Sequence, residues 1–372
     1  MRITYNTMYS NIVKFIDENY DKLNTINEHV SSGKKINNLS DAPLEATKIV
    51  RLNKKLNAIN QYSRNITTAG IWLKTTDSAL MQLKSLTSQV RQLATQAASD
   101  TYNFDQRKSL AVQIDAIADN VMEIANTDVN GKYIFSGFKV NKKPFEKEIN
   151  SSNSNYSIDG YSYNFDLDVT IHMIDSSHYE FKVFNGPWIR KKDGTGFEIN
   201  SVNPILGFSI NSSSPSAGDD VSFKIQHVYK GDNGKFKIDV DKTQKLQVNK
   251  LGSEVFTTEN ENTNIFRSLG KIWAGMITNN RDLIEDELGN LPKIETNLLD
   301  HDAEIGLKQN LLENFKTDFI QDKKKAVTDE LSEIQDTDIA EEMTLLAKQQ
   351  IVYQATLKTA SIIANLNILN FI

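Results

Sequence analysis

The sequence predicts a mainly α-helical, multidomain α+β protein, in which both chain ends form a long antiparallel coiled-coil rod with an inserted β domain. Three observations support this fold class. Residues 1–130 contain only two glycines, whereas residues 131–252 hold eleven of the 17 glycines and four of the six prolines. Apolar residues recur at helical spacing on both sides of this middle segment. Inside it, apolar and polar residues alternate as in half-buried strands.

The first predicted helix carries apolar residues three or four positions apart on one face: Ile12, Ile16, Tyr20, Leu23, Ile26 and Val30. It should end near Gly33, because glycine readily takes the left-handed conformation of a helix C-cap. Asp41 or Ser40 can cap the next helix, with Pro43 in its first turn.

The second predicted helix, over about 43–98, carries two heptad series. The first contains Leu52, Ile59, Ile66, Leu73, Leu80, Thr87 and Ala94, and the second contains Tyr62, Ala69, Thr76, Leu83, Val90 and Ala97. Repeats in this register specify a coiled-coil seam. An unbroken helix of this length would extend roughly 85 Å.

Further helices are predicted over 105–129, from Ile265 to Met276, from Pro292 onward, and over the heptads from Ile339 to Ala364. Residues 343–372 contain only two charges, Lys348 and Lys358. Such a helix should be buried against more than a single partner face. The C-terminal stretch 362–372 places large apolar residues all around a helix. We therefore expect the chain ends to bury this surface on joining an assembly.

The predicted domains are an inner terminal helical pair, a helical bundle rod and an inserted β-rich outer domain. Their boundaries are 1–42 with 336–372, 43–140 with 256–335, and 141–255, respectively.

Composition excludes several classes of function. The chain of 372 residues has a net charge of −6, so it lacks the basic field of a general nucleic-acid-binding protein. It has no cysteine, which excludes disulfides, zinc–thiolate sites and cysteine nucleophiles. The sequence shows no cleavable signal peptide and no membrane span. We expect a cytoplasmic protein, or one exported without a cleaved signal.

No group of residues predicts an active site, a metal site or a cofactor site, and we expect no enzyme. His172 and His178 would lie too far apart on a straight strand to bind one metal. Asp166 and Asp168 alternate with apolar residues and should point to solvent. The aromatic residues Phe135, Phe138, Trp188 and Trp273 are expected in the core.

Motifs at both ends resemble those of one family. Residues 31–37 (SSGKKIN) and 40–43 (SDAP) resemble the SSGxRIN…DDP signature of bacterial flagellins and their junction homologues. Lys35 stands where the family usually has arginine. Residues 124–127 (IANT) and 131–137 (GKYIFSG) resemble the LANT…GxYLFxG block of the hook-associated protein 3 group. Residues 336–340 and 349–355 resemble the family's C-terminal helix.

The resemblance implies a structural subunit that forms the hook–filament junction of the flagellum by head-to-tail self-association, in a ring of about eleven copies. It implies hook-associated protein 1 as the hook-side partner, flagellin as the filament-side partner, and an export chaperone before secretion. The protein would be extracellular and exported through the flagellar type III apparatus. The expected assembly residues are Ile12, Ile16, Leu23, Gly33, Asn37, Asp41, Pro43, Leu346, Tyr353, Leu357 and Ile363.

Three alternatives stay open at this point. Flagellin itself would polymerise alone into long filaments. A secreted glycan-binding or hydrolytic protein would act through residues 140–255, where the sequence names no site. A type III needle-tip protein also has a long coiled coil with an inserted domain, but its ends should not match these motifs.

Overall fold

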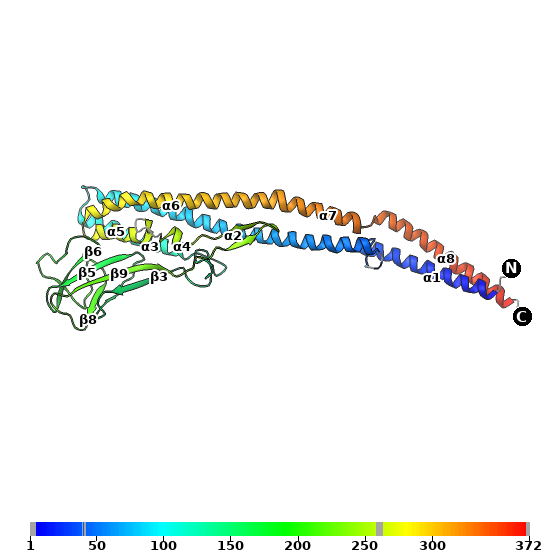
Figure 1. Cartoon of the computed structure of the whole chain (residues 1–372), viewed down its shortest axis with the longest axis horizontal. Helices are drawn as coiled ribbons and strands as arrows, with labels where there is room; N and C mark the ends of the chain where they lie inside the picture. The colour runs from blue at the N-terminus through cyan, green and yellow to red at the C-terminus, as the bar shows by residue number, and fades with distance from the viewer. Residues whose placement is uncertain (1–4, 39, 41, 258–262, 370–372) are drawn as a thin grey trace. The chain divides into compact units, whose positions relative to one another are not determined.

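The structure is a computed structural model that describes residues 5–38, 40, 42–257 and 263–369. Its helices are α1 (Tyr5–Ser32), α2 (Pro43–Ala98), α3 (Phe104–Ala125), α4 (Gly252–Val255), α5 (Ile265–Ile277), α6 (Arg281–Asn314), the π-helix η2 (Phe315–Gln321), α7 (Asp322–Gln335) and α8 (Ile339–Leu369). Along the sequence, helices occupy the first and last thirds, and the strands lie between them, as the green part of the ribbon in Figure 1 shows. The predicted α+β fold class is therefore confirmed.

The strands are β1 (Asp128–Val129), β2 (Lys132–Tyr133), β3 (Phe145–Ser151), β4 (Tyr156–Asp159), β5 (Leu167–Met173), β6 (His178–Val183), β7 (Phe197–Glu198), β8 (Ser209–Ser212), β9 (Asp220–Tyr229), β10 (Lys237–Asp239) and β11 (Lys245–Gln247). Five of them form an antiparallel sheet in the order β3-β9-β5-β6-β7. The others pair as β1-β2, β4-β8 and β10-β11.

The chain divides into two compact units. Unit 1 comprises residues 1–63 and 316–372, and unit 2 comprises residues 64–315. The domain boundaries expected from the sequence stay a prediction.

Helix α2 has the bounds that its heptads predict. Every residue of the first series is buried, from Leu52 to Ala94, and so is the second series from Ala69 to Ala97. The two buried threonines, Thr76 and Thr87, donate their hydroxyls to the carbonyls of Trp72 and Leu83 at 2.9 and 2.8 Å. Because each hydroxyl is hydrogen-bonded within the helix, a threonine can occupy the buried seam without leaving an unpaired polar atom.

The helical core of unit 2 lies where α2, α3, α5 and α6 meet. Its apolar contacts come from all four helices, at Leu86, Val90, Val121, Ile265, Leu269, Leu291 and Ile294. Helices α2 and α6 are also joined by ion pairs, Lys84 with Asp302 at 3.0 Å and Arg91 with Glu295.

Two predicted helix boundaries were wrong. Helix α6 begins at Arg281 rather than at Pro292, because the Asn280 side chain caps it and the buried stripe of Ile284 and Leu291 runs on through the proline. This packing outweighs the cost of about 3 kcal/mol for a proline inside a helix. Helix α3 ends at Ala125, before the expected Val129. The residues that follow form the β1–β2 hairpin, whose Asn130-Gly131 turn has positive φ at both residues.

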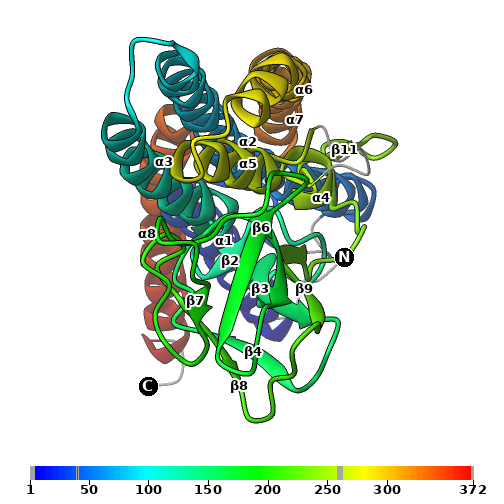
Figure 2. The same ribbon diagram turned by 90° about the vertical axis from the view of Figure 1, so that its left-hand side faces the viewer.

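The sheet of unit 2 packs next to α5 (Figure 2). Alternate residues of β5 and β9 are buried, including Val169, Ile171, Val221 and Phe223. Gly270 of α5 lies against the chain just before β5. A Cβ atom at Gly270 would be 1.8 Å from the carbonyl oxygen of Asp166, so only glycine fits this approach.

Asp166 is buried, which contradicts the expectation that it points to solvent. Its Oδ1 accepts the backbone N–H of His227 at 2.7 Å and lies 3.0 Å from the Nδ1 of the same residue. The His227 ring stacks on Phe266 of α5. Asp166 precedes β5 and is drawn inward by these partners, so the strand alternation used to predict its direction does not apply to it.

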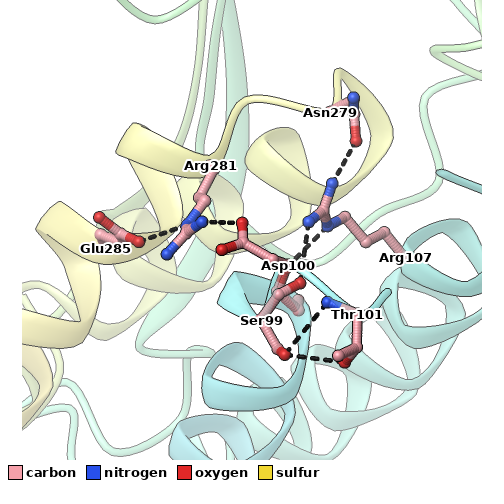
Figure 3. Close-up of polar contacts among 8 residues, drawn as sticks. Ser99, Asp100, Thr101, Arg107, Asn279, Arg281 and Glu285 are labelled. Carbon is pink, nitrogen blue, oxygen red and sulfur yellow. Dashed lines mark hydrogen bonds and ion pairs between the residues drawn. The ribbon is translucent and has the colours of Figure 1, made fainter. Parts of the chain in front are cut away.

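Arg107 closes the end of the helical core in unit 2 (Figure 3). Its guanidinium donates to the carbonyls of Ala97 and Ser99 at 2.7 and 3.1 Å, and to Asn279 Oδ1 at 2.5 Å. It thereby ties the end of α2 to the turn between α5 and α6.

We expect Arg107→Ala to lower the free energy of unfolding by about 2 kcal/mol, because buried carbonyls lose a charged donor. Chemical denaturation followed by circular dichroism measures this loss. The neighbouring, exposed Lys108→Ala is the matched control and should change stability by less than about 0.5 kcal/mol. Equal effects of the two substitutions would contradict the role given to Arg107.

Glu304 of α6 is held by two lysines. Its partial burial would raise the pKa, but hydrogen bonds and charge from Lys250 and Lys308 lower the pKa of Glu304 to about 2. Lys250 is itself buried, and Lys308 Nζ lies 2.7 Å from Glu304 Oε1.

The folded pKa of Glu304 is below its value of about 4.3 in an unfolded chain. The stabilisation is therefore present above about pH 4.3 and is lost as the pH falls toward 2. Because this side chain is 47% exposed, solvent screening limits the effect to about 1 kcal/mol. Glu304→Gln should be less stable than the unchanged chain at pH 7, and the difference should shrink at pH 3. A difference independent of pH, measured by urea denaturation, would refute this assignment.

Candidate functional site: the terminal helical pair

Helices α1 and α8 of unit 1 lie side by side and antiparallel (Figure 1). We call them the terminal pair. Five of the predicted assembly residues are half-buried in it: Ile12, Ile16, Leu23, Leu346 and Tyr353. The Tyr353 ring lies 6.0 Å from that of Tyr20.

Polar contacts fix the register of the terminal pair. Asn19 donates to Thr356 Oγ1 at 3.3 Å, and Gln349 donates to both the backbone and the side-chain oxygen of Asn19 at 3.1 Å. Nearer the linkers, His29 Nδ1 lies 3.2 Å from Glu342 Oε1. These contacts join residues more than 300 positions apart, so they define one alignment of the two chain ends.

The two linkers that lead into the terminal pair bind each other through their backbones. Lys35 N–H donates to the Gln335 carbonyl at 2.9 Å, and Thr337 N–H donates to the Gly33 carbonyl at 3.0 Å. The Lys35 ammonium also donates to the Glu333 carbonyl at 2.8 Å. We call this contact the linker clasp.

Gly33 makes the turn into the linker clasp possible. Its φ of +70° confirms the predicted left-handed cap, and its N–H donates to the His29 carbonyl at 2.8 Å. Asn37 is half-buried and donates to the Lys34 carbonyl at 3.3 Å. Pro43 is exposed at the first position of α2, whereas Asp41 lies outside the described residues.

The terminal pair leaves a large apolar surface in solvent. Leu357 is 42% exposed and Ile351 is 68% exposed. Other exposed apolar residues of the pair are Met8, Tyr9, Val13, Phe15, Ile339, Met343, Leu345, Val352 and Ile362. Ile363 belongs to α8, but its side chain lies outside the described part of the chain.

A shallow groove runs along this surface between the two helices. It is lined by Ile12, Phe15, Asn19, Val352, Ala355, Thr356 and Thr359. Phe15 and Val352 are not among the predicted assembly residues, because they lie outside the stripe on which each helix meets its partner. The sequence does carry a signal for this second surface, since apolar residues in α1 and α8 also lie outside that stripe.

Exposed apolar residues in such number mark an interaction surface. The described residues contain no group of three histidine, aspartate or glutamate side chains able to hold a metal ion. Among the described helices, none is both long and apolar enough to cross a membrane.

Two family models match the ends of the chain. The bacterial flagellin N-terminal helical region matches residues 3–140, and the bacterial flagellin C-terminal helical region matches residues 288–372. Both segments of the terminal pair fall within these matches.

Individual relatives carry flagellar names. Flagellar hook-associated protein 3 of Salmonella typhimurium is 32% identical over 148 residues, which are 40% of this chain and 47% of that protein. The match thus spans about half the length of this relative. Polar flagellin F of Vibrio parahaemolyticus is 23% identical over 375 residues, covering 96% of this chain and 95% of that protein.

A solved structure shares the fold. The structure of a hook-associated flagellar protein from Vibrio parahaemolyticus covers 80% of this chain and 100% of its own, with a TM-score of 0.54 and 16% identity. This likeness concerns the fold alone.

Proposed function

Because the chain belongs to the bacterial flagellin family through both of its helical end regions, we propose that it is a structural subunit of the flagellum at the hook–filament junction. The observation that carries the proposal is the exposed apolar surface of the terminal pair, which a single copy does not cover. The match to hook-associated protein 3 supports the junction rather than the filament.

The proposed mechanism is mechanical. The apolar surface of one terminal pair packs on a different surface of the next copy, and such heterologous contacts close into a ring when the rotation allows it. Burial of apolar area contributes about 25 cal/mol per Å², so a surface of this kind can drive assembly without a cofactor. We propose that Ile12, Ile16, Leu23, Leu346, Tyr353, Leu357 and Ile363 bury the terminal pair in the ring.

The linker clasp has a separate role in this proposal. Gly33, Asn37 and Asp41 belong to the linker between α1 and α2, and Pro43 begins α2 directly after it. This segment sets how the terminal pair of each copy meets its neighbours. The finer assignments follow the family resemblance: about eleven copies, hook-associated protein 1 on the hook side, flagellin on the filament side, and a chaperone before type III export.

Electron microscopy of cells that lack this chain tests the proposal, with flagellin assayed in the medium. Intact hooks, absent filaments and flagellin released into the medium are the expected result. Normal filaments would overturn the junction role.

Flagellin is the second candidate, and the match to polar flagellin F along nearly the full chain favours it. The same experiment separates the two. Cells without filaments and without released flagellin would identify this chain as the filament subunit. Polymerisation of the purified chain alone into long filaments would agree with that outcome.

A further inference from the structure

A short extended segment follows β6 in unit 2 and pairs with it. Phe181 and Ile189 form an antiparallel bridge in which each N–H donates to the other's carbonyl, at 3.2 and 2.7 Å. This register places Trp188 beside Lys182 on the outward face. The Lys182 ammonium lies 4.8 Å from the centre of the Trp188 ring.

Trp188 is 43% exposed, which contradicts the expectation that it lies in the core. The ring is nevertheless held in place, because His172 of β5 also contacts it edge-on at 6.0 Å. An exposed tryptophan with a fixed orientation is a ready platform for a ligand, since little rotamer freedom is lost on binding. Phe138, also expected in the core, is exposed as well, but among the described residues no cation lies over its ring.

The row that begins at Trp188 continues across the sheet. Thr170 of β5 pairs with Lys182 on one side and with Ser222 of β9 on the other. The hydroxyls of Thr170 and Ser222 lie 3.2 Å apart and are exposed. An aromatic ring, an ammonium group and two hydroxyls therefore lie in one row across the outward face of the sheet.

This part of the chain is locally basic although the whole chain has a net charge of −6. Residues 180–193 contain four cations, Lys182, Arg190, Lys191 and Lys192, and two carboxylates, Glu180 and Asp193. Glu180 is occupied, because Arg190 Nε donates to it at 2.5 Å and lowers the pKa of Glu180. Among the described residues, Arg190 is the cation paired with Glu180, and no carboxylate lies within ion-pair distance of Lys182 or Lys192.

We propose that this outward sheet face binds an acidic polysaccharide. The apolar C–H face of a sugar ring would stack on Trp188, because the aromatic face carries negative charge density that attracts C–H groups. Lys182 and the Lys191-Lys192 turn would bind the sugar carboxylates, and Thr170 and Ser222 would hydrogen-bond to hydroxyls. The four cations of the segment attract an anionic ligand, while Asp220 of the same face is paired with His172 at 2.8 Å. The hydroxyls of Thr170 and Ser222 offer hydrogen-bond partners to a sugar chain.

The presence of such a polymer around the protein rests on the proposed extracellular location. The binding test does not, because it uses the purified full chain. The two proposals therefore fail separately: the junction role fails in the deletion strain, and the binding site fails in the test below.

The test is retention of the chain on immobilised polygalacturonate, with Kd measured by calorimetry. We expect binding that weakens at least tenfold in Trp188→Ala and in Lys182→Glu, and that weakens with added salt. Matched controls are Phe138→Ala, an exposed aromatic residue of the same unit, and Lys237→Glu, an exposed lysine on β10. Both controls should bind as the unchanged chain does.

Four results would overturn the proposal. The first is no binding to polygalacturonate, and the second is equally tight binding to neutral dextran. The third is equally tight binding to inorganic polyphosphate, if the Trp188→Ala substitution does not weaken it. The fourth is tighter binding to single-stranded DNA. Circular dichroism of each variant excludes loss of fold as the cause, because Trp188 and Lys182 lie on the surface and their replacement should leave the spectrum unchanged.

Discussion

Leu357→Asp is expected to abolish filaments on cells while leaving the chain folded and exported. Leu357 is 42% exposed on α8, so a charge there costs the single copy little. In the proposed assembly the same position is buried, and an unpaired buried carboxylate costs several kcal/mol. Electron microscopy of cells that carry the variant, together with circular dichroism of the purified chain, measures both halves of this prediction.

The matched control is Leu357→Met, which keeps an apolar side chain of similar volume. It should support normal filaments. Ile351→Asp probes a second exposed position on the same helix and should behave as Leu357→Asp does. Normal filaments on either aspartate variant would show that this position is not part of the assembly surface.

Gly270→Ala is expected to lower the free energy of unfolding of unit 2 by about 3 kcal/mol. The added methyl group would lie 1.8 Å from the Asp166 carbonyl oxygen, so α5 and the start of β5 must move apart. That movement also strains the buried contact between Asp166 and His227. Urea denaturation with an unchanged m-value would report the loss.

Gly306→Ala is the matched control for this prediction. Gly306 is also helical, but a Cβ atom there meets nothing within 4 Å. Alanine has the higher helix propensity, so this variant should be more stable by up to about 1 kcal/mol. If both substitutions changed stability in the same direction, the close approach at Gly270 would not be the cause.

The helices of this chain were predictable because their apolar residues repeat over many turns. In α2, positions from Leu52 to Ala94 repeat every seven residues and are buried as the repeat requires. The strand region was predictable in kind, since alternation in β5 and β6 and the glycine-rich turns exclude a continuous helix.

Features set by tertiary contacts were not predictable. Pro292 signals a helix start locally, but the packing of Leu291 and Ile294 carries α6 through it. The sequence around Asp166 predicts a surface residue, but Asp166 is buried because it contacts His227, 61 positions later. Trp188 was predicted in the core, but the bridge between Phe181 and Ile189 places it on the outward face. In each case the deciding partner is distant in sequence or set by strand register.

The candidate assembly surface was predictable only in part. The apolar, nearly uncharged last helix indicated an interaction surface, and the motifs at both ends indicated the family. The groove beside Phe15 required the pairing of α1 with α8, whose register depends on Asn19 and Gln349. These polar residues carry no periodic signal.

The linker clasp and the contact between His29 and Glu342, 313 positions apart, can form only when both ends of the chain are available. Unit 2 is a continuous segment and closes on itself once residue 315 is available. Helix α1 has to wait for α8, and closing so long a loop is slow and entropically costly unless the intervening segment has already folded. We therefore expect unit 2 to fold before the terminal pair, so that the apolar surface of the pair forms in the last step.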